Sequence, residues 1–179
     1  MAMLIKPSLE RKNSFLEMYL TYQKFGEADW CVSYTDALTD FSGMVDRLIN
    51  HSKGIGIPSD WVPTSHFWLI HEDRVGGTLR IRHRLTPVVA EKAGHIGYDI
   101  APPLRGRGLG HEILRLGLNE ANKLGIEDIM AICAETNIPS QRILMRHGKI
   151  ESKRSNGEVV YWLKSQGGKQ RFTNSHVGN

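Results

Sequence analysis

The sequence of 179 residues contains no apolar run that approaches the roughly 20 residues needed to span a bilayer. Its first residues also lack the apolar stretch of a secretory signal. Only two cysteines occur, Cys31 and Cys133, and they are too far apart in sequence to form a CxxC pair or a zinc-ligand cluster. These absences predict a cytoplasmic protein with no membrane partner, no disulfide and no metal site.

The sequence also lacks a large excess of charge of either sign. The 23 lysines and arginines face 19 acidic residues, giving a formal net charge of +4, and the basic residues are dispersed along the chain. A nucleic-acid-binding protein usually concentrates its basic residues on one face, so no nucleic-acid partner is expected. The length and the 40% of hydrophobic residues suit one domain with a sizeable core. We predict a single domain over residues 1–164, followed by a flexible polar tail over residues 165–179.

Hydrophobic periodicity predicts helices in the first third of the chain and a strand-rich remainder. After a short strand at Ile5-Lys6, helices are expected over 8–25, 39–52, 108–124 and 137–147. Strands are expected over 66–70, 75–83, 94–100, 126–134, 149–151 and 158–163. Loops are expected over 54–64 and 84–93, and Gly76-Gly77 is a predicted bulge. This order predicts an α/β fold of the mixed α+β kind, with one sheet covered by helices.

The most informative segment is the glycine-rich loop Arg105-Gly106-Arg107-Gly108-Leu109-Gly110, which follows a strand and two prolines and precedes a helix. Glycines let successive backbone N–H groups converge on one anion, and the helix N-terminus adds unpaired donors and a positive dipole end. The two arginines add positive charge. The segment therefore suits a pyrophosphate.

Other phosphate-binding patterns fit this loop less well. A Walker A loop requires Lys-Ser/Thr after its last glycine, but His111-Glu112 follow Gly110. A dinucleotide fingerprint requires a third glycine, which His111 replaces, although Glu127 and Asp128 lie near the distance expected for a ribose-binding acid. The strands before the loop also form a meander rather than a βαβ unit. A glycine-rich turn without a ligand is the remaining alternative.

The loop resembles the R/Q-x-x-G-x-G/A signature of the GNAT superfamily of N-acetyltransferases. A second resemblance lies in Asn137-Ile138-Pro139-Ser140, which is similar to the family's N-x-x-S/A helix and is followed by Gly148. The strand 95–100 resembles the family's fourth strand. Together these similarities cover about residues 65–163.

The resemblance implies a twisted, mostly antiparallel sheet that is splayed between its fourth and fifth strands, which end at Ile100 and Ala134. Acetyl-CoA would be the co-substrate. Its pyrophosphate would lie on the loop, and its pantetheine arm would pair with the main chain at Ile100 and Ala101. Asn137 would hydrogen-bond the arm from the other side, and it can also act as a helix N-cap. The predicted coenzyme-binding residues are Ile100, Ala101, Arg105, Gly106, Arg107, Gly108, Leu109, Gly110 and Asn137.

The sequence identifies the catalytic residues less clearly than the coenzyme-binding residues. Many family members carry a tyrosine one turn before the end of the second helix, and here that position is Leu144. His95 stands where family members carry a carboxylate on the fourth strand, and a near-neutral pKa would let it act as a base. Glu135 follows the fifth strand and would draw a proton through water or anchor a cationic substrate. Tyr98 and Asp99 alternate across the fourth strand, so only one of them faces the cleft.

We predict an acetyl-CoA-dependent N-acetyltransferase that acts on an amine-bearing acceptor, either a small molecule or a protein N-terminus. The two loops at 54–64 and 84–93 are expected to frame the acceptor entrance, with Trp61, His66 and Arg82 as candidate lining residues. A homodimer is possible because dimers are common in the superfamily. A non-catalytic acyl-CoA-binding regulatory module on the same fold and an ADP- or NAD-binding protein are the alternatives.

Overall fold

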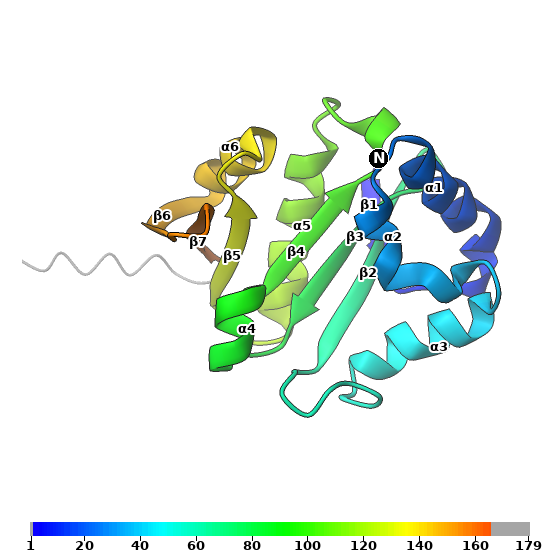
Figure 1. Cartoon of the computed structure of the whole chain (residues 1–179), viewed down its shortest axis with the longest axis horizontal. Coiled ribbons are helices and arrows are strands. Elements are labelled where there is room, and N and C mark those ends of the chain that lie inside the picture. The colour runs from blue at the N-terminus through cyan, green and yellow to red at the C-terminus, as the bar shows by residue number, and fades with distance from the viewer. Residues whose placement is uncertain (1, 166–179) are drawn as a thin grey trace, which may run out of the picture.

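The computed structural model describes residues 2–165, and they contain one mixed sheet in the order β1-β2-β3-β4-β5-β7-β6 (Figure 1). Every neighbouring pair is antiparallel except β4 and β5, which are parallel. The strands are β1 (Ala2–Ile5), β2 (Thr64–His71), β3 (Arg74–Arg82), β4 (Ile96–Ile100), β5 (Asp128–Ala134), β6 (Gly148–Lys153) and β7 (Glu158–Lys164). The predicted fold class is confirmed. The predicted tail lies outside the described residues apart from Ser165.

Helices cover both faces of the sheet. They are α1 (Lys12–Lys24), α2 (Ala28–Cys31), α3 (Phe41–His51), α4 (Pro87–Lys92), α5 (Leu109–Lys123) and α6 (Ile138–His147). Residues 2–165 also contain three short 3-10 helices, η1 (Leu9–Arg11), η2 (Val32–Ala37) and η3 (Pro102–Leu104). No helix among residues 2–165 is long and apolar enough to cross a membrane.

Side-chain alternation along the strands creates two separate cores. On β2, Phe67 and Leu69 pack with α5 and the buried faces of β4, β5 and β7. The alternate residues, Trp68 and Ile70, pack with α1, α2, η2 and α3 on the opposite face. The sheet is therefore the middle layer between an α5/α6 layer and an α1–α3 layer.

Two segments differ from the expected elements. Residues 84–93, predicted as a loop, contain α4, whose N-cap Thr86 accepts a hydrogen bond from the Val89 N–H and whose first residue is Pro87. Proline at the first position of a helix after a threonine cap is a start signal that the sequence did contain. The short helices α2 and η2 between α1 and α3 were not predicted either.

The predicted bulge at Gly76-Gly77 is confirmed. Leu69 lies opposite Gly77 and Ile70 lies opposite Val75, so Gly76 is the extra residue of β3. The bulge sets the register of β3 against β4, in which Thr78 lies opposite Asp99 and Arg80 opposite Gly97. This register decides which side chains of β3 lie beside β4.

Trp68 is the centre of the core beneath α1–α3. Its side chain is 0% exposed, and its ring lies 4.6 Å from that of Phe15 and 6.2 Å from that of Phe41, measured between centroids. We expect Trp68→Ala to lower the free energy of unfolding by about 3–5 kcal/mol, because it removes a large buried side chain and leaves a cavity. Denaturant unfolding measures this loss. Phe25→Ala, at a side chain 56% exposed, is the control and should change the value by less than about 0.5 kcal/mol.

Candidate functional site

The glycine-rich loop is open to solvent at the N-terminus of α5. Residues 105–108 are exposed, and Gly106 and Gly108 have left-handed backbone conformations with φ of 76° and 80°. A Cβ added to either glycine would meet no atom within 4 Å. The loop therefore has free space in front of its backbone, and the 15 residues of α5 place unpaired N–H groups beside it. This arrangement suits an anion.

The last glycine of the motif has a different role. A Cβ on Gly110 would come within 2.6 Å of Cδ1 of Ile143, which belongs to α6. Gly110 therefore allows α6 to pack closely on the first turn of α5. This packing brings Asn137, the N-cap of α6, to the same end of the sheet as the loop, where its side chain accepts a hydrogen bond from the Ser140 N–H at 3.2 Å.

The two arginines of the loop differ in what surrounds them. The guanidinium of Arg105 donates two hydrogen bonds to the carboxylate of Glu27, at 2.6 and 2.7 Å, and its Nε donates to the Ile100 carbonyl at 2.9 Å. Its charge is thus already paired with a carboxylate. Arg107 is exposed. The Arg105 side chain instead ties the loop to the segment between α1 and α2.

Beside the loop, β4 and β5 separate. They pair at one register position, Ile96 with Ala131, and then diverge toward their carboxyl ends (Figure 1). The residues of β4 that hydrogen-bond β3 alternate along the strand, so the backbone groups of Tyr98 and Ile100 point toward β5. Beyond the Ile96–Ala131 pair these groups have no strand partner among the described residues. The result is an unpaired strand edge that starts beside the glycine-rich loop.

Tyr98 and Asp99 lie on opposite faces of β4. The Tyr98 hydroxyl reaches α6 and lies 3.3 Å from Oγ of Ser140, and burial raises the pKa of Tyr98 to about 12. Asp99 projects toward the α1–α3 layer, where its carboxylate accepts a hydrogen bond from Nη2 of Arg80 at 2.5 Å. Burial raises the pKa of Asp99, and the neighbouring Arg80 opposes this rise. The gap between β4 and β5 is therefore bordered by Tyr98 on the α5/α6 face of the sheet and by Asp99 on the α1–α3 face.

A profile of the GNAT acetyltransferase domain matches residues 23–149, which is well over half of the chain. The chain belongs to the GNAT acetyltransferase family. GNAT domains use acetyl-CoA as their co-substrate, so the resemblance predicted from the two glycine-containing motifs is confirmed. A search of curated proteins gives no significant match to the sequence.

Solved structures with the same fold include several acetyltransferases, three of which illustrate the similarity. RimJ of Mycobacterium smegmatis in complex with CoA-disulfide is 18% identical, covers 92% of this chain and 82% of its own, and superposes with a TM-score of 0.66. MccE, the microcin C7 self-immunity acetyltransferase in complex with acetyl-CoA and AMP, is 14% identical over 91% and 92% of the chains, with a TM-score of 0.65. The Salmonella typhimurium acetyl transferase that modifies the N-terminal serine of ribosomal protein L7/L12 is 17% identical over 91% and 94%, with a TM-score of 0.62. At these identities the structures show the GNAT fold alone.

The two residues predicted to be catalytic, His95 and Glu135, each contact other parts of the protein. His95 is buried at the closed end of the separated strands, where its Nδ1 accepts a hydrogen bond from the Met130 N–H at 3.0 Å. Burial also lowers the pKa of His95. Glu135 is exposed and forms an ion pair with Lys153 of β6 at 2.6 Å, on the side of β5 away from β4. Leu144, at the family's tyrosine position, is buried in the core.

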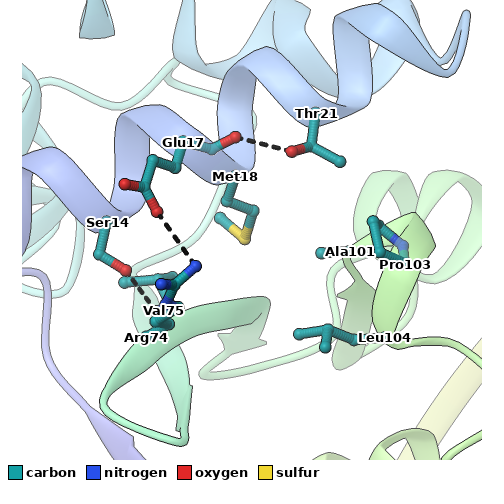
Figure 2. Close-up of a pocket in the computed structure, with 9 residues that line it drawn as sticks. All are labelled: Ser14, Glu17, Met18, Thr21, Arg74, Val75, Ala101, Pro103 and Leu104. Atoms are coloured by element: carbon teal, nitrogen blue, oxygen red, sulfur yellow. Dashed lines mark hydrogen bonds and ion pairs between the residues drawn. The ribbon is translucent and has the colours of Figure 1, made fainter.

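A separate pocket of about 160 Å³ lies between α1 and the segment that leads into the glycine-rich loop (Figure 2). Its walls include Met18 of α1, Val75 of β3 and Leu104 of η3, and Ser14 Oγ accepts a hydrogen bond from the Val75 N–H at 2.7 Å. A pocket for a drug-sized ligand usually encloses about 300–1,000 Å³, so this one is too small for a coenzyme.

The Glu27–Arg105 pair should contribute to stability in a pH-dependent way. The Arg105 hydrogen bonds lower the pKa of Glu27, so the pair stabilises the fold above the ordinary carboxyl pKa and loses this effect as pH falls through the lowered value. Because both side chains are more than one-third exposed, screening limits the effect to about 0.5–1 kcal/mol. We expect Glu27→Gln to lower the free energy of unfolding by this amount at pH 7 and by nothing at an acidic pH below the lowered pKa of Glu27.

Denaturant unfolding at the two pH values measures this difference. Glu17→Gln is the control, because its pair with Arg74 is wider, at 3.8 Å, and more exposed. A loss at pH 7 equal to that of Glu17→Gln would contradict a stabilising role for the pair.

Proposed function

We propose that this protein transfers the acetyl group of acetyl-CoA to a primary amine of a small molecule or a protein N-terminus, and that it does so in the cytoplasm. The observation that carries the proposal is the open glycine-rich loop at the N-terminus of α5, directly beside the unpaired edges of β4 and β5. Family membership makes acetyl-CoA the group that these features would hold. The free space in front of Gly106 and Gly108 supports the fit, because it leaves their backbone accessible to a phosphate.

The residues proposed to hold the coenzyme fall in two sets. Backbone N–H groups of residues 106–110 and the exposed side chain of Arg107 would bind the pyrophosphate. The backbone N–H groups of Ile100 and Ala134 beside the gap would donate to the carbonyl oxygens of the pantetheine arm, as a strand would. The carbonyls of the two residues already accept hydrogen bonds from Nε of Arg105 and from the Asn137 N–H. The Ala101 N–H is already bonded to the Gly76 carbonyl and its carbonyl already accepts the Leu104 N–H, each at 2.9 Å, so only the second lone pair of that carbonyl is left for the arm. Asn137 would contribute from the start of α6.

Acetyl transfer forms a C–N bond, breaks the thioester C–S bond and releases one proton from the amine. When bound, acetyl-CoA supplies the activated acetyl group. We assign proton acceptance to Asp99, directly or through water, because its carboxylate is half-buried beside the open end of β4 and burial raises its pKa. Tyr98 would donate a hydrogen bond to the departing sulfur from the opposite face. With its pKa near 12 the phenol stays protonated at neutral pH.

Turnover with a panel of primary amines tests the proposal. The protein should bind acetyl-CoA saturably and release free CoA thiol only when an amine acceptor is present. Saturable binding with no turnover on any acceptor would favour the non-catalytic acyl-CoA-binding module. Stronger thermal stabilisation by NAD or ADP than by CoA would instead favour a nucleotide-binding protein.

A further inference from the structure

Two arginines of β3 converge above β4 in the α1–α3 layer. His66 lies opposite Arg80 and Thr64 opposite Arg82, so both arginines share the sheet face of Trp68. A Cβ placed on Gly97 of β4 would lie 3.8 Å from Nη2 of Arg80 and 3.9 Å from Nη1 of Arg82. Because residue 97 is glycine, both guanidinium groups can lie over the same point of β4.

The charge at this point is not balanced. Arg80 pairs with Asp99, but no carboxylate of residues 2–165 forms an ion pair with Arg82, and Nε of each arginine is buried without a hydrogen-bond partner there. The side chains of Arg80 and Asp99 remain 23% and 31% exposed, so a solute can reach them. Two half-buried cations beside one carboxylate leave an excess positive charge, which an anion would compensate.

Arg82 is held in place by its surroundings. Its guanidinium lies over the Trp61 ring, 5.5 Å from the centroid, and its Nη1 donates to the carbonyls of Ala93 and Gly94 at 3.4 and 3.2 Å. Burial, together with the neighbouring Arg80, lowers the pKa of Arg82 to about 10, which leaves it charged at neutral pH. A fixed guanidinium loses less side-chain freedom when it binds a carboxylate.

We propose that Arg82 and Arg80 form a carboxylate subsite over Gly97, and that the acetyl acceptor is a small primary amine that carries a carboxylate. This inference rests on the transferase function proposed above. Asp99 follows Gly97 by two residues, which is about 6–7 Å along a strand, toward the open end of the separated strands. A carboxylate over Gly97 therefore places an amine three to five bonds away beside Asp99, at the edge where the acetyl group would be delivered. Trp61 and Arg82, which the sequence placed only at the acceptor entrance, would then act together, because the Trp61 ring supports the Arg82 guanidinium.

Kinetics with matched acceptors test the subsite. The panel contains the L-amino acids and the ω-amino acids of three to six carbons, each beside its carboxamide. The wild-type protein should prefer the best acid over its carboxamide by at least about tenfold in kcat/KM. Arg82→Gln should raise the KM for that acid about 10- to 100-fold, because it removes a charge-assisted interaction, and should leave the Kd for acetyl-CoA unchanged. Arg74→Gln is the control, since Arg74 is exposed at the other end of β3, and it should behave like the wild type.

Two outcomes would overturn the inference while leaving the transferase function intact: equal or better use of the carboxamides, or better use of amidated peptides than of the small acids. If no amine is acetylated although acetyl-CoA binds, the transferase function fails, and a second readout judges the subsite. Glutarate, a dicarboxylate without an amine, should raise the Tm of the wild type and of Arg74→Gln more than that of Arg82→Gln. Equal shifts in all three proteins would overturn the subsite.

Discussion

Gly108→Asn is expected to raise the Kd for acetyl-CoA at least about 100-fold, which corresponds to about 2.7 kcal/mol of binding free energy. Gly108 has φ of 80°, and asparagine tolerates this left-handed conformation better than other side chains. The new side chain has room in the free protein, because no atom lies within 4 Å of its Cβ. It would therefore fill the space that a phosphate needs while perturbing the fold little. Isothermal titration calorimetry measures the change.

Gly125→Asn is the matched control at the other end of α5. Gly125 has φ of 75° and equally open surroundings, but it lies far along the helix from the loop. The two variants should therefore share any cost of backbone strain, and only Gly108→Asn should lose acetyl-CoA. Similar affinities in both variants would contradict the assignment of the loop to the pyrophosphate.

Asp99→Asn is expected to lower kcat/KM for the amine about 100-fold, because it removes the proton acceptor together with the charge that pairs with Arg80, and to change the Kd for acetyl-CoA less than twofold. The pH profile provides a second test. Burial raises the pKa of Asp99, so wild-type activity should fall as pH drops through a value above the ordinary aspartate range. The asparagine variant should lack that acid limb. Steady-state kinetics over a pH series measure both effects.

Glu135→Gln is the control for this assignment. Glu135 is exposed and paired with Lys153 on the far side of β5, so its replacement should change kcat/KM less than twofold. Loss of activity in Glu135→Gln with retention in Asp99→Asn would reverse the two roles and restore the residue that the sequence favoured.

The glycine-rich loop at the start of α5 was predictable because its signal is local. The glycines, the two prolines before them and the amphipathic helix after them are contiguous, and each restricts the backbone of its own neighbourhood. The mixed sheet followed from periodicity in the same way, and the glycine pair at 76–77 marked the bulge that sets the register of β3.

The side-chain contacts around the loop and β4 were not predictable because they depend on register and on distant segments. Glu27 and Arg105 are 78 residues apart, and nothing in either local sequence indicates that they pair. The sequence showed only that Tyr98 and Asp99 alternate along their strand. The register of β3 against β4, which places Arg80 beside Asp99, was needed to tell which face each of them lies on. His95 and Glu135 were chosen by position along the strands, which carries no information about which side chains are already engaged.

A crystal structure with bound acetyl-CoA tests the central claim most directly. The account predicts phosphate oxygens within hydrogen-bond distance of the backbone nitrogens of residues 106–110, and the pantetheine arm between β4 and β5 beside Tyr98. Acetyl-CoA bound elsewhere, with that gap empty and the loop free of phosphate, would contradict it.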